Sequence, residues 1–148
     1  MTVLRVLGLE NIEQAAAIHA QAMADGLGGK AWTAETFATL LATQGTFGWM
    51  VEDAAVMLVR QTDETAEIFT IGVAPSARRM GLARALLQTA YVALQALGAV
   101  RLQLEVAVDN LPAQHLYRTE GFEAVGRRPN YYRRGSGSVD ALIMERQL

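Results

Sequence analysis

Hydrophobic and polar positions along the chain change period several times, and each change predicts an element. Residues 2–7 alternate weakly, which predicts a first strand, while apolar residues recur at helical spacing over residues 10–23. Asn11 is a candidate cap for that helix, and Thr33 with an acidic residue two positions later is typical of the start of a second one. Three glycines within residues 26–29 predict a loop between the two helices.

From Phe47 onward the pattern becomes strand-like. Three apolar runs, over residues 47–51, 54–61 and 66–73, are separated by short acidic stretches, and they predict an antiparallel meander. Strong helix formers follow Gly81, and Gly98 is a natural stop for that helix.

The second half of the chain predicts the fold class. Residues 101–108 alternate, with leucine and valine on one face and Gln103 and Glu105 on the other. A short helix is expected to start at Asn110 and run through Thr119, with Gly121 ending it, followed by a closing pair of strands around a Gly/Ser-rich loop. The strand–helix–strand unit over residues 67–108 requires a parallel pair joined by a right-handed crossover. The predicted class is therefore mixed α/β.

Composition narrows the picture further. The chain has 148 residues, of which 51% are hydrophobic and 19% charged, which suits one globular domain over residues 1–148. It has no cysteine, no apolar run of membrane-spanning length and no signal-peptide pattern, which fits a cytoplasmic protein without a membrane partner. A net charge of −2 argues against nucleic-acid binding. His19 and His115 are far apart, so neither a metal site nor a catalytic role is expected for them.

The stretch "ARRMGLARALL", residues 77–87, places arginines and a glycine at the start of an apolar helix. The first amides of a helix have no internal partner and lie at the positive end of the helix dipole, so this arrangement suits a phosphate. The spacing matches neither the dinucleotide-binding nor the P-loop pattern. A solvated basic loop whose glycine serves only the turn would explain the same residues.

A second stretch, "LEVAVDNLPAQHLYRTEGF", places Glu105 on the polar face of a strand and Tyr117 on the helix that follows. A carboxylate and a phenol are both side chains that can transfer a proton. Taken alone, Glu105 is also explained as a polar residue on a wet strand face, Tyr117 as a core aromatic, and Asn110 as a helix cap.

Together with "IGVAPSARRMGLARALL" and the tail "GRRPNYYRR…DALIM", these stretches resemble the GCN5-related N-acetyltransferase (GNAT) family over about the last eighty residues. Within that family the resemblance is greatest to the bacterial enzymes that acetylate the N-terminal alanine of a ribosomal protein. The resemblance implies a twisted mixed sheet, flanked by helices, whose two parallel strands splay apart around acetyl-CoA.

The resemblance also implies a cofactor site. The residues matching the family's acetyl-CoA contacts are Ile71, Gly72, Val73, Arg79, Met80, Gly81, Leu82, Ala83, Arg84 and Asn110. The stretch Arg79–Arg84 would hold the pyrophosphate, with the side chains of Arg79 and Arg84 adding charge, and the strand end Ile71–Val73 would contact pantetheine and the acetyl group. A glycine inside a strand marks a bulge or a close backbone approach, and a bulge at Gly72 would splay the two strands.

By the same resemblance, Glu105 matches the general base and Tyr117 the general acid. An N-terminal ammonium has a pKa near 8, so about a third is neutral near pH 7.5, and a carboxylate acting through water is an adequate base. A raised pKa in the partly buried strand would help. Tyrosine stays protonated at neutral pH and can donate to the leaving thiolate.

Tyr131 and Tyr132 match residues that wall the acceptor groove, although hairpin packing would explain them equally well. The expected acceptor is the N-terminal alanine of the eighteenth small-subunit ribosomal protein. The four arginines of residues 127–134 do not fit a basic acceptor, and Asp140 is expected to offset part of their charge. Lys30 and Ala31 stand where the family usually has proline before Trp32, which leaves the specificity of the Gly26–Trp32 loop open.

Alternatives follow from the same residues. An acetyltransferase acting on another N-terminus, on lysine or on a small amine would use the same cofactor site, and so would a non-catalytic acyl-CoA-binding module. A mere binding module needs neither Glu105 nor Tyr117. The sequence sets no oligomeric state and is compatible with a monomer.

Overall fold

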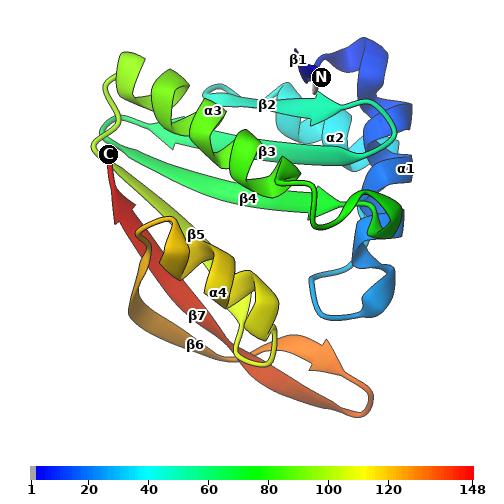
Figure 1. Ribbon diagram of the computed structural model, residues 1–148, viewed down its shortest axis with the longest axis vertical. Helices are drawn as coiled ribbons and strands as arrows, with labels where there is room; N and C mark the ends of the chain where they lie inside the picture. Colours follow the sequence, from blue (N-terminus) through cyan, green and yellow to red (C-terminus); the bar gives the residue numbers. More distant parts are fainter. Residues whose placement is uncertain (1–2) are drawn as a thin grey trace.

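The computed structural model describes residues 3–148, so Thr2 of the predicted first strand lies outside the described residues. A mixed sheet has the strand order β1-β2-β3-β4-β5-β7-β6 (Figure 1). The strands are β1 (Leu4–Val6), β2 (Thr46–Val51), β3 (Ala55–Thr62), β4 (Thr65–Val73), β5 (Arg101–Ala107), β6 (Glu123–Arg134) and β7 (Gly137–Gln147).

Helices connect and cover these strands, and the predicted helices are confirmed within one or two residues. The first of them, α1, is preceded by the 3-10 turn η1 and followed by the 3-10 turn η2. The helical elements are η1 (Leu9–Asn11), α1 (Ile12–Ala22), η2 (Met23–Asp25), α2 (Ala34–Leu41), η3 (Pro75–Ala77), α3 (Leu82–Ala96) and α4 (Leu111–Thr119).

Two hydrophobic cores lie on the two faces of the sheet. The first five residues of strand β3, Ala55–Val59, are apolar because they are buried on both faces, and their side chains alternate between the two cores. The first core, under α3 and α4, includes Met57, Val59, Leu86, Leu94, Leu102, Tyr117, Phe122 and Met144. The second, under α1 and α2, includes Leu7, Ala15, Ile18, Phe37, Met50, Val56 and Leu58.

The parallel pair β4 and β5 is joined only at one end. Thr65, Ala66 and Glu67 pair with residues 101–103, and the two strands then diverge (Figure 1). On its other edge β5 pairs with β7 along its whole length. The expected splay is therefore present, and it divides the sheet into a four-strand part and a three-strand part.

The local cause of the splay differs from the prediction. Leu58 pairs with Thr70 and Val59 pairs with Ile68, which leaves Phe69 as the extra residue of a bulge. Gly72 is regularly paired with Val56. The expectation of a bulge at Gly72 is therefore wrong, because the extra residue lies three positions earlier.

The helix caps give one confirmation and one correction. The Thr33 hydroxyl accepts a hydrogen bond from the Thr36 amide at 3.2 Å, as its N-cap role requires. The Asn11 side chain caps nothing, because the 3-10 turn η1 precedes the helix and its backbone supplies the start. Within residues 3–148 no helix combines the length and apolar character needed to cross a bilayer.

Candidate active site

The start of helix α3 presents backbone amides without an acceptor in the described part of the chain. Its first internal hydrogen bond runs from the Ala85 amide to the Gly81 carbonyl oxygen, at 3.0 Å. The amides of Leu82, Ala83 and Arg84 therefore have no partner within residues 3–148. Gly81 is left-handed, with φ +76°, and nothing lies within 4 Å of the place where a Cβ would stand. The space beside Gly81 is therefore open, which suits the approach of an anion to the helix start.

Arg78 fastens the loop before α3 to the end of α1. Its guanidinium donates to the carbonyl oxygens of Val73, at 3.2 Å, and Ala22, at 3.1 Å. It also forms an ion pair with Asp25 at 3.3 Å. The loop is thus held in place by a guanidinium that is already bound to two carbonyl oxygens and a carboxylate.

Arg79 and Arg84 have contrasting surroundings. Arg84 forms an ion pair with Glu120 at 3.0 Å, and that carboxylate is only 6% exposed. The Arg84 guanidinium is thus turned toward the end of α4, and its backbone amide is the part available at the start of α3. Arg79 and the neighbouring Met80 are exposed, and no carboxylate within residues 3–148 pairs with Arg79.

The carboxyl end of β4 lies along the splay. Ile71 and Val73 pair with β3 on one edge, and no described strand pairs with the other edge beyond Glu67. A Cβ at Gly72 would lie 2.8 Å from the Cβ of Ala22, closer than two such carbons approach. Glycine is therefore required here by the packing of α1, a reason that the sequence did not suggest.

Glu105 lies on β5 beside the splay, on the face opposite the α4 core. Its side chain is mostly buried, at 15% exposure, and its Oε1 accepts a hydrogen bond from Arg128 Nε at 2.5 Å. The Tyr132 hydroxyl donates to the Glu105 carbonyl oxygen at 3.3 Å. Glu105 is therefore held by two side chains of β6, the strand at the edge of the sheet.

A second carboxylate, Glu67, faces this region from β4. It pairs in register with Gln103, two residues before Glu105. Burial raises the pKa of Glu67, and the negative charge of Glu105 raises it further. The sequence prediction did not include Glu67; its one signal was a lone acidic residue inside an apolar strand.

Tyr117 is buried on the inner face of α4, where it packs edge-on against Phe122 with ring centroids 5.7 Å apart. Burial raises the pKa of Tyr117 well above its ordinary value, and nearby Tyr132 adds to the shift. No group within residues 3–148 forms a hydrogen bond with its hydroxyl. The phenol therefore stays protonated at neutral pH and is free to donate.

The turn between β5 and α4 is fixed by side-chain amides. The Asn110 oxygen accepts a hydrogen bond from the Ala113 amide at 3.4 Å, so the capping role is present. The buried Gln114 donates to the carbonyl oxygens of Ala107 and Val108, at 2.9 Å each. Asn110 therefore stands at the carboxyl end of β5, beside the splay.

Tyr131 and Tyr132 lie in an irregular part of β6. Arg128 pairs with Ala141 and Tyr132 with Val139, so the segment between them bulges out of the sheet. Burial raises the pKa of Tyr132 to about 12. For Tyr131, burial and then a hydrogen bond to Glu105 raise the pKa. The bulge thus turns both rings toward Glu105.

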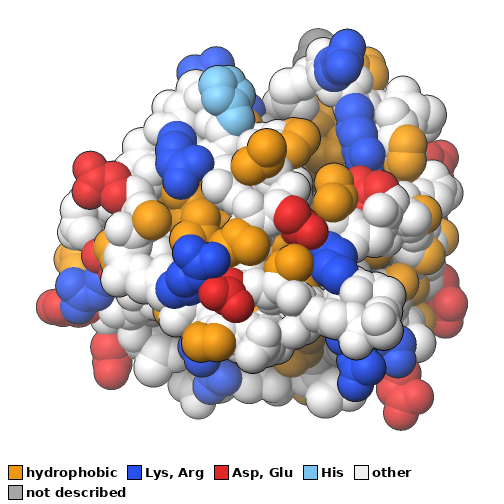
Figure 2. All heavy atoms as spheres, turned by 90° about the horizontal axis from the view of Figure 1, so that it is seen from below, with side chains coloured by type: hydrophobic (Ala, Val, Ile, Leu, Met, Phe, Trp, Pro, Cys, Tyr) orange, Lys and Arg blue, Asp and Glu red, His pale blue; other side chains and the backbone are white. Residues whose placement is uncertain are grey.

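The arginine cluster of β6 is largely neutralised by acidic partners. Arg127 pairs with Asp140 at 2.6 Å, which confirms the predicted role of that aspartate. Arg128 pairs with Glu105, and Arg134 pairs with Asp109 at 2.7 Å. Figure 2, which views the molecule from the end occupied by β6, β7 and α4 in Figure 1, shows basic and acidic side chains next to one another. The cluster therefore presents little free positive charge to a basic acceptor.

His19 is a residue whose importance the sequence prediction missed. Its ring is only 1% exposed; Nδ1 accepts a hydrogen bond from the Trp32 amide at 2.9 Å, and Nε2 lies 2.8 Å from the Thr70 hydroxyl. The ring also stacks on Trp32, with centroids 5.0 Å apart. One signal was present, because His19 is four residues after Ala15 on the apolar face of α1. His19 therefore anchors the end of the Gly26–Trp32 loop to the core.

This burial predicts acid sensitivity. It lowers the pKa of His19 to about 4 from an unfolded value of 6.5, so between these values the unfolded chain binds more protons. We expect the free energy of unfolding to fall by about 2 to 3 kcal/mol between pH 7.5 and pH 4.5 on account of this group. Urea denaturation at both pH values should show the loss in the wild type and a smaller one in His19→Gln. Equal losses in the two proteins would contradict the assignment.

The described residues offer no obvious metal centre. Within residues 3–148, no three His, Cys, Asp or Glu side chains are grouped so that they could hold a metal ion. The chemistry available at the splay is therefore that of two carboxylates, three phenols and unpaired amides.

Comparisons with known proteins agree with this arrangement. The family model described as the acetyltransferase (GNAT) family matches residues 17–122. A [ribosomal protein bS18]-alanine N-acetyltransferase of Escherichia coli (strain K12) is 32% identical over 142 residues, which cover 94% of each chain.

Solved structures share the fold. The crystal structure of the ribosomal-protein-S18-alanine N-acetyltransferase from Escherichia coli superposes with a TM-score of 0.86 at 30% identity, covering 99% of this chain and 94% of that one. The NatC complex bound to Gag peptide and CoA contains a chain with a TM-score of 0.80 at 22% identity, covering 99% of this chain and 98% of that one. This chain therefore belongs to the GNAT family and is an N-acetyltransferase.

Proposed function

We propose that this enzyme transfers the acetyl group of acetyl-CoA to the N-terminal α-amine of a protein, by direct attack of the amine on the thioester. The expected acceptor is the N-terminal alanine of small-subunit ribosomal protein 18, the acceptor type named for the 32%-identical relative. The observation that carries the proposal is that Glu105 and Tyr117 are both neighbours of Tyr132, beside the place where β4 and β5 diverge: the Tyr132 hydroxyl donates to the Glu105 backbone oxygen, and Tyr132 contributes to the raised pKa of Tyr117. A cytoplasmic location suits such an acceptor.

The residues at the splay fit acetyl-CoA, which supplies the thioester. The unpaired amides at the start of α3 fit a diphosphate, and the unpaired edge of β4 fits an extended pantetheine chain with its own amide groups. The proposed cofactor residues are Ile71, Gly72, Val73, Arg79, Met80, Gly81, Leu82, Ala83, Arg84 and Asn110. For Arg84 the proposed contact is the backbone amide, because the guanidinium is paired with Glu120.

Glu105 is the proposed general base. About a third of an α-amine is already neutral near pH 7.5, so the carboxylate needs only to take the remaining proton, directly or through water. The ammonium of the acceptor is also attracted to the paired carboxylates Glu105 and Glu67. Because Arg128 forms an ion pair with Glu105, the acceptor amine must either bind the carboxylate together with that guanidinium or displace it.

Tyr117 is the proposed general acid, which gives its hydroxyl proton to the departing thiolate. Its unpaired hydroxyl and raised pKa both favour a phenol that is protonated until the thiolate forms. Tyr131 and Tyr132 are the proposed walls of the acceptor groove, because the β6 bulge brings them to Glu105.

The phosphate assignment predicts a salt-dependent effect of Arg79. Replacing Arg79 with alanine should weaken CoA binding about fivefold to tenfold at low salt, because an exposed arginine adds a charge-assisted bond to a phosphate. The effect should shrink between about 50 mM and about 500 mM salt, where exposed charges are screened. Calorimetric titration of CoA measures it, with Arg5→Ala on distant β1 as the control. A loss that is independent of salt would contradict the phosphate contact.

Mass spectrometry of acetylated peptides tests the proposed function. The enzyme is incubated with acetyl-CoA and three peptides: an alanine-first peptide, the same peptide with a blocked N-terminus, and a blocked peptide with an internal lysine. We expect a single acetyl group on the α-amine of the first peptide alone. Acetylation of the lysine peptide at an equal or higher rate would replace the proposed acceptor with a side-chain amine.

A further inference from the structure

The loop Gly26–Trp32 lies against the groove residues from the opposite half of the sheet. A Cβ at Gly29 would lie 3.9 Å from the Tyr132 ring, and the Tyr132 hydroxyl is bonded to the Glu105 backbone. The loop therefore stands beside the strand that carries the proposed base. Any acceptor that reaches Glu105 passes close to it.

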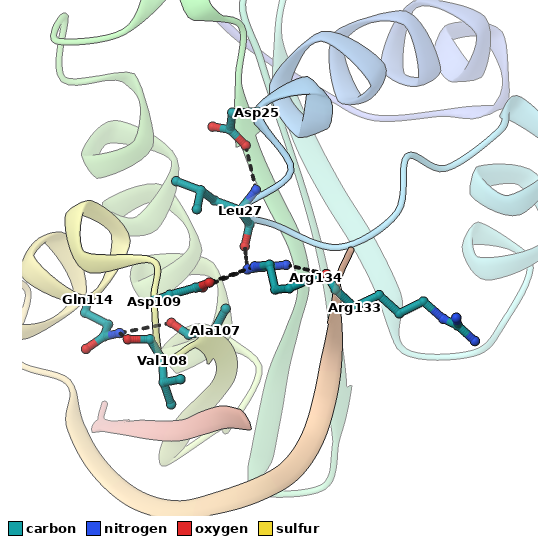
Figure 3. Close-up of polar contacts among 8 residues, drawn as sticks. All are labelled: Asp25, Leu27, Ala107, Val108, Asp109, Gln114, Arg133 and Arg134. Carbon is teal, nitrogen blue, oxygen red and sulfur yellow. Dashed lines mark hydrogen bonds and ion pairs between the residues drawn. The ribbon is translucent and has the colours of Figure 1, made fainter. Parts of the chain in front are cut away.

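Both halves of the sheet hold this loop. On the β4 side, Arg78 pairs with Asp25, whose other oxygen accepts a hydrogen bond from the Leu27 amide at 3.0 Å. On the β5–β6 side, Arg134 donates to the Leu27 carbonyl oxygen at 2.8 Å (Figure 3). The segment from Asp25 to Leu27 thus bridges the splay.

Arg134 is held in a geometry that only a guanidinium can provide. It makes two parallel hydrogen bonds to the Asp109 carboxylate, of 2.7 and 2.8 Å, while one of the same nitrogens also reaches Leu27. Its guanidinium lies 5.8 Å from the centre of the Tyr132 ring. Asp109 is itself fixed, because it directly follows the turn that Gln114 holds.

The neighbouring Arg133 provides a natural comparison. It is exposed, its side chain points away from the bridge, and within residues 3–148 it has no ion pair (Figure 3). The two residues carry the same charge one position apart. A comparison of the two residues therefore distinguishes the effect of the Arg134 contacts from the effect of its positive charge alone.

We propose that Arg134 is a positioning residue for the acceptor, and that it holds the Gly26–Trp32 loop beside Glu105 by joining Leu27 to Asp109. The inference rests on the proposed function, and it adds a residue that positions one wall of the acceptor groove. It also explains one arginine of the β6 cluster as a structural anchor, because the hydrogen bonds of Arg134 go to Asp109 and Leu27. Within residues 3–148, Arg134 makes no hydrogen bond or ion pair with the residues at the start of α3 that are proposed to hold the diphosphate, so the affinity for acetyl-CoA should change little.

Steady-state kinetics of Arg134→Gln and Arg133→Gln with acetyl-CoA and the alanine-first peptide test this inference. Arg134→Gln should raise the KM for the peptide about tenfold, the effect of losing a charge-assisted hydrogen bond, while the KM for acetyl-CoA stays within about twofold. Arg133→Gln should change neither constant. Asp109→Asn, which keeps the shape of the partner, should raise the peptide KM in the same direction by less.

Hydrogen exchange of the loop amides provides the second readout. Exchange over residues 26–32 should be faster in Arg134→Gln than in Arg133→Gln, with the core strands unchanged. A peptide KM for Arg134→Gln equal to that of Arg133→Gln, or an equal rise of both KM values, would overturn the positioning role alone. A wild-type enzyme that acetylates no α-amine would instead overturn the proposed function and this inference with it.

Discussion

Replacing Glu105 with glutamine is expected to lower kcat about 100-fold to 10,000-fold, the range in which a positioned general base contributes. Glutamine keeps the shape of the side chain and can still accept a bond from Arg128, so the fold should be retained. Affinity for CoA should change little, because the proposed cofactor contacts lie at the start of α3 and on β4. The loss should be greatest near neutral pH and smaller at alkaline pH, where the α-amine is already neutral.

The matched control is Glu145→Gln. Glu145 lies on neighbouring β7 and accepts a hydrogen bond from Gln103 at 2.6 Å, so the same chemical change is made in the same sheet without touching the proposed base. Single-turnover rates with bound acetyl-CoA separate the chemical step from binding. A Glu105→Gln rate within twofold of the Glu145→Gln rate would remove Glu105 from the role of base. A greater loss in Glu67→Gln would transfer that role to the carboxylate of β4.

Replacing Tyr117 with phenylalanine is expected to lower kcat about 100-fold or more, since the proton donor to the thiolate is lost. Stability should hardly change, because the hydroxyl has no hydrogen-bond partner within residues 3–148 and its removal leaves no group unpaired. The raised pKa of Tyr117 keeps the wild-type phenol protonated, so this group should add no fall in rate up to about pH 10.

A second buried tyrosine serves as the control for this change. The Tyr91 hydroxyl donates to Glu120 at 3.3 Å, away from the splay. Tyr91→Phe should therefore cost about 1 kcal/mol of stability and leave kcat unchanged, the reverse of the expected pattern for Tyr117→Phe. Thermal denaturation and kcat measured on both variants decide the matter. A wild-type kcat in Tyr117→Phe would contradict its role as acid.

Helices and strands with a clear hydrophobic period were predictable because the spacing of their apolar residues shows which face is buried. Residues 101–108 alternate at the strand period, and the residues after Gly81 are good helix formers that end at a glycine. Thr33 could be identified as a cap because its partner is only three residues away. Local physics sufficed for each of these features.

The missed features depend on groups distant in the chain. His19 is buried because Trp32 and Thr70 lie over it, and neither contact can be read from α1 alone. The bulge at Phe69 arises from the pairing of β3 with β4, which the sequence of β4 alone does not show. The sequence points to Gly72 instead because glycine inside a strand often marks a bulge. Asn11 does not cap α1 because it is the last residue of the 3-10 turn η1, and the sequence has no clear signal for that turn.

The candidate site shows the same division. Glu105 and Tyr117 could be proposed because they match the family motif, which lies within one strand and the helix that follows it. Their surroundings could not, because Arg128 lies 23 residues from Glu105 and Arg134 lies 107 residues from Leu27. The pairing of Arg84 with Glu120 was likewise hidden, since a basic residue at a helix start resembles an anion ligand until its partner is seen.

A crystal structure of this protein with bound CoA tests the central claim most directly. The account predicts the diphosphate on the amides of Gly81–Arg84, the pantetheine along the free edge of β4, and the sulfur within hydrogen-bond distance of the Tyr117 hydroxyl. Coenzyme bound away from the splay, or a sulfur out of reach of both Tyr117 and Glu105, would contradict it.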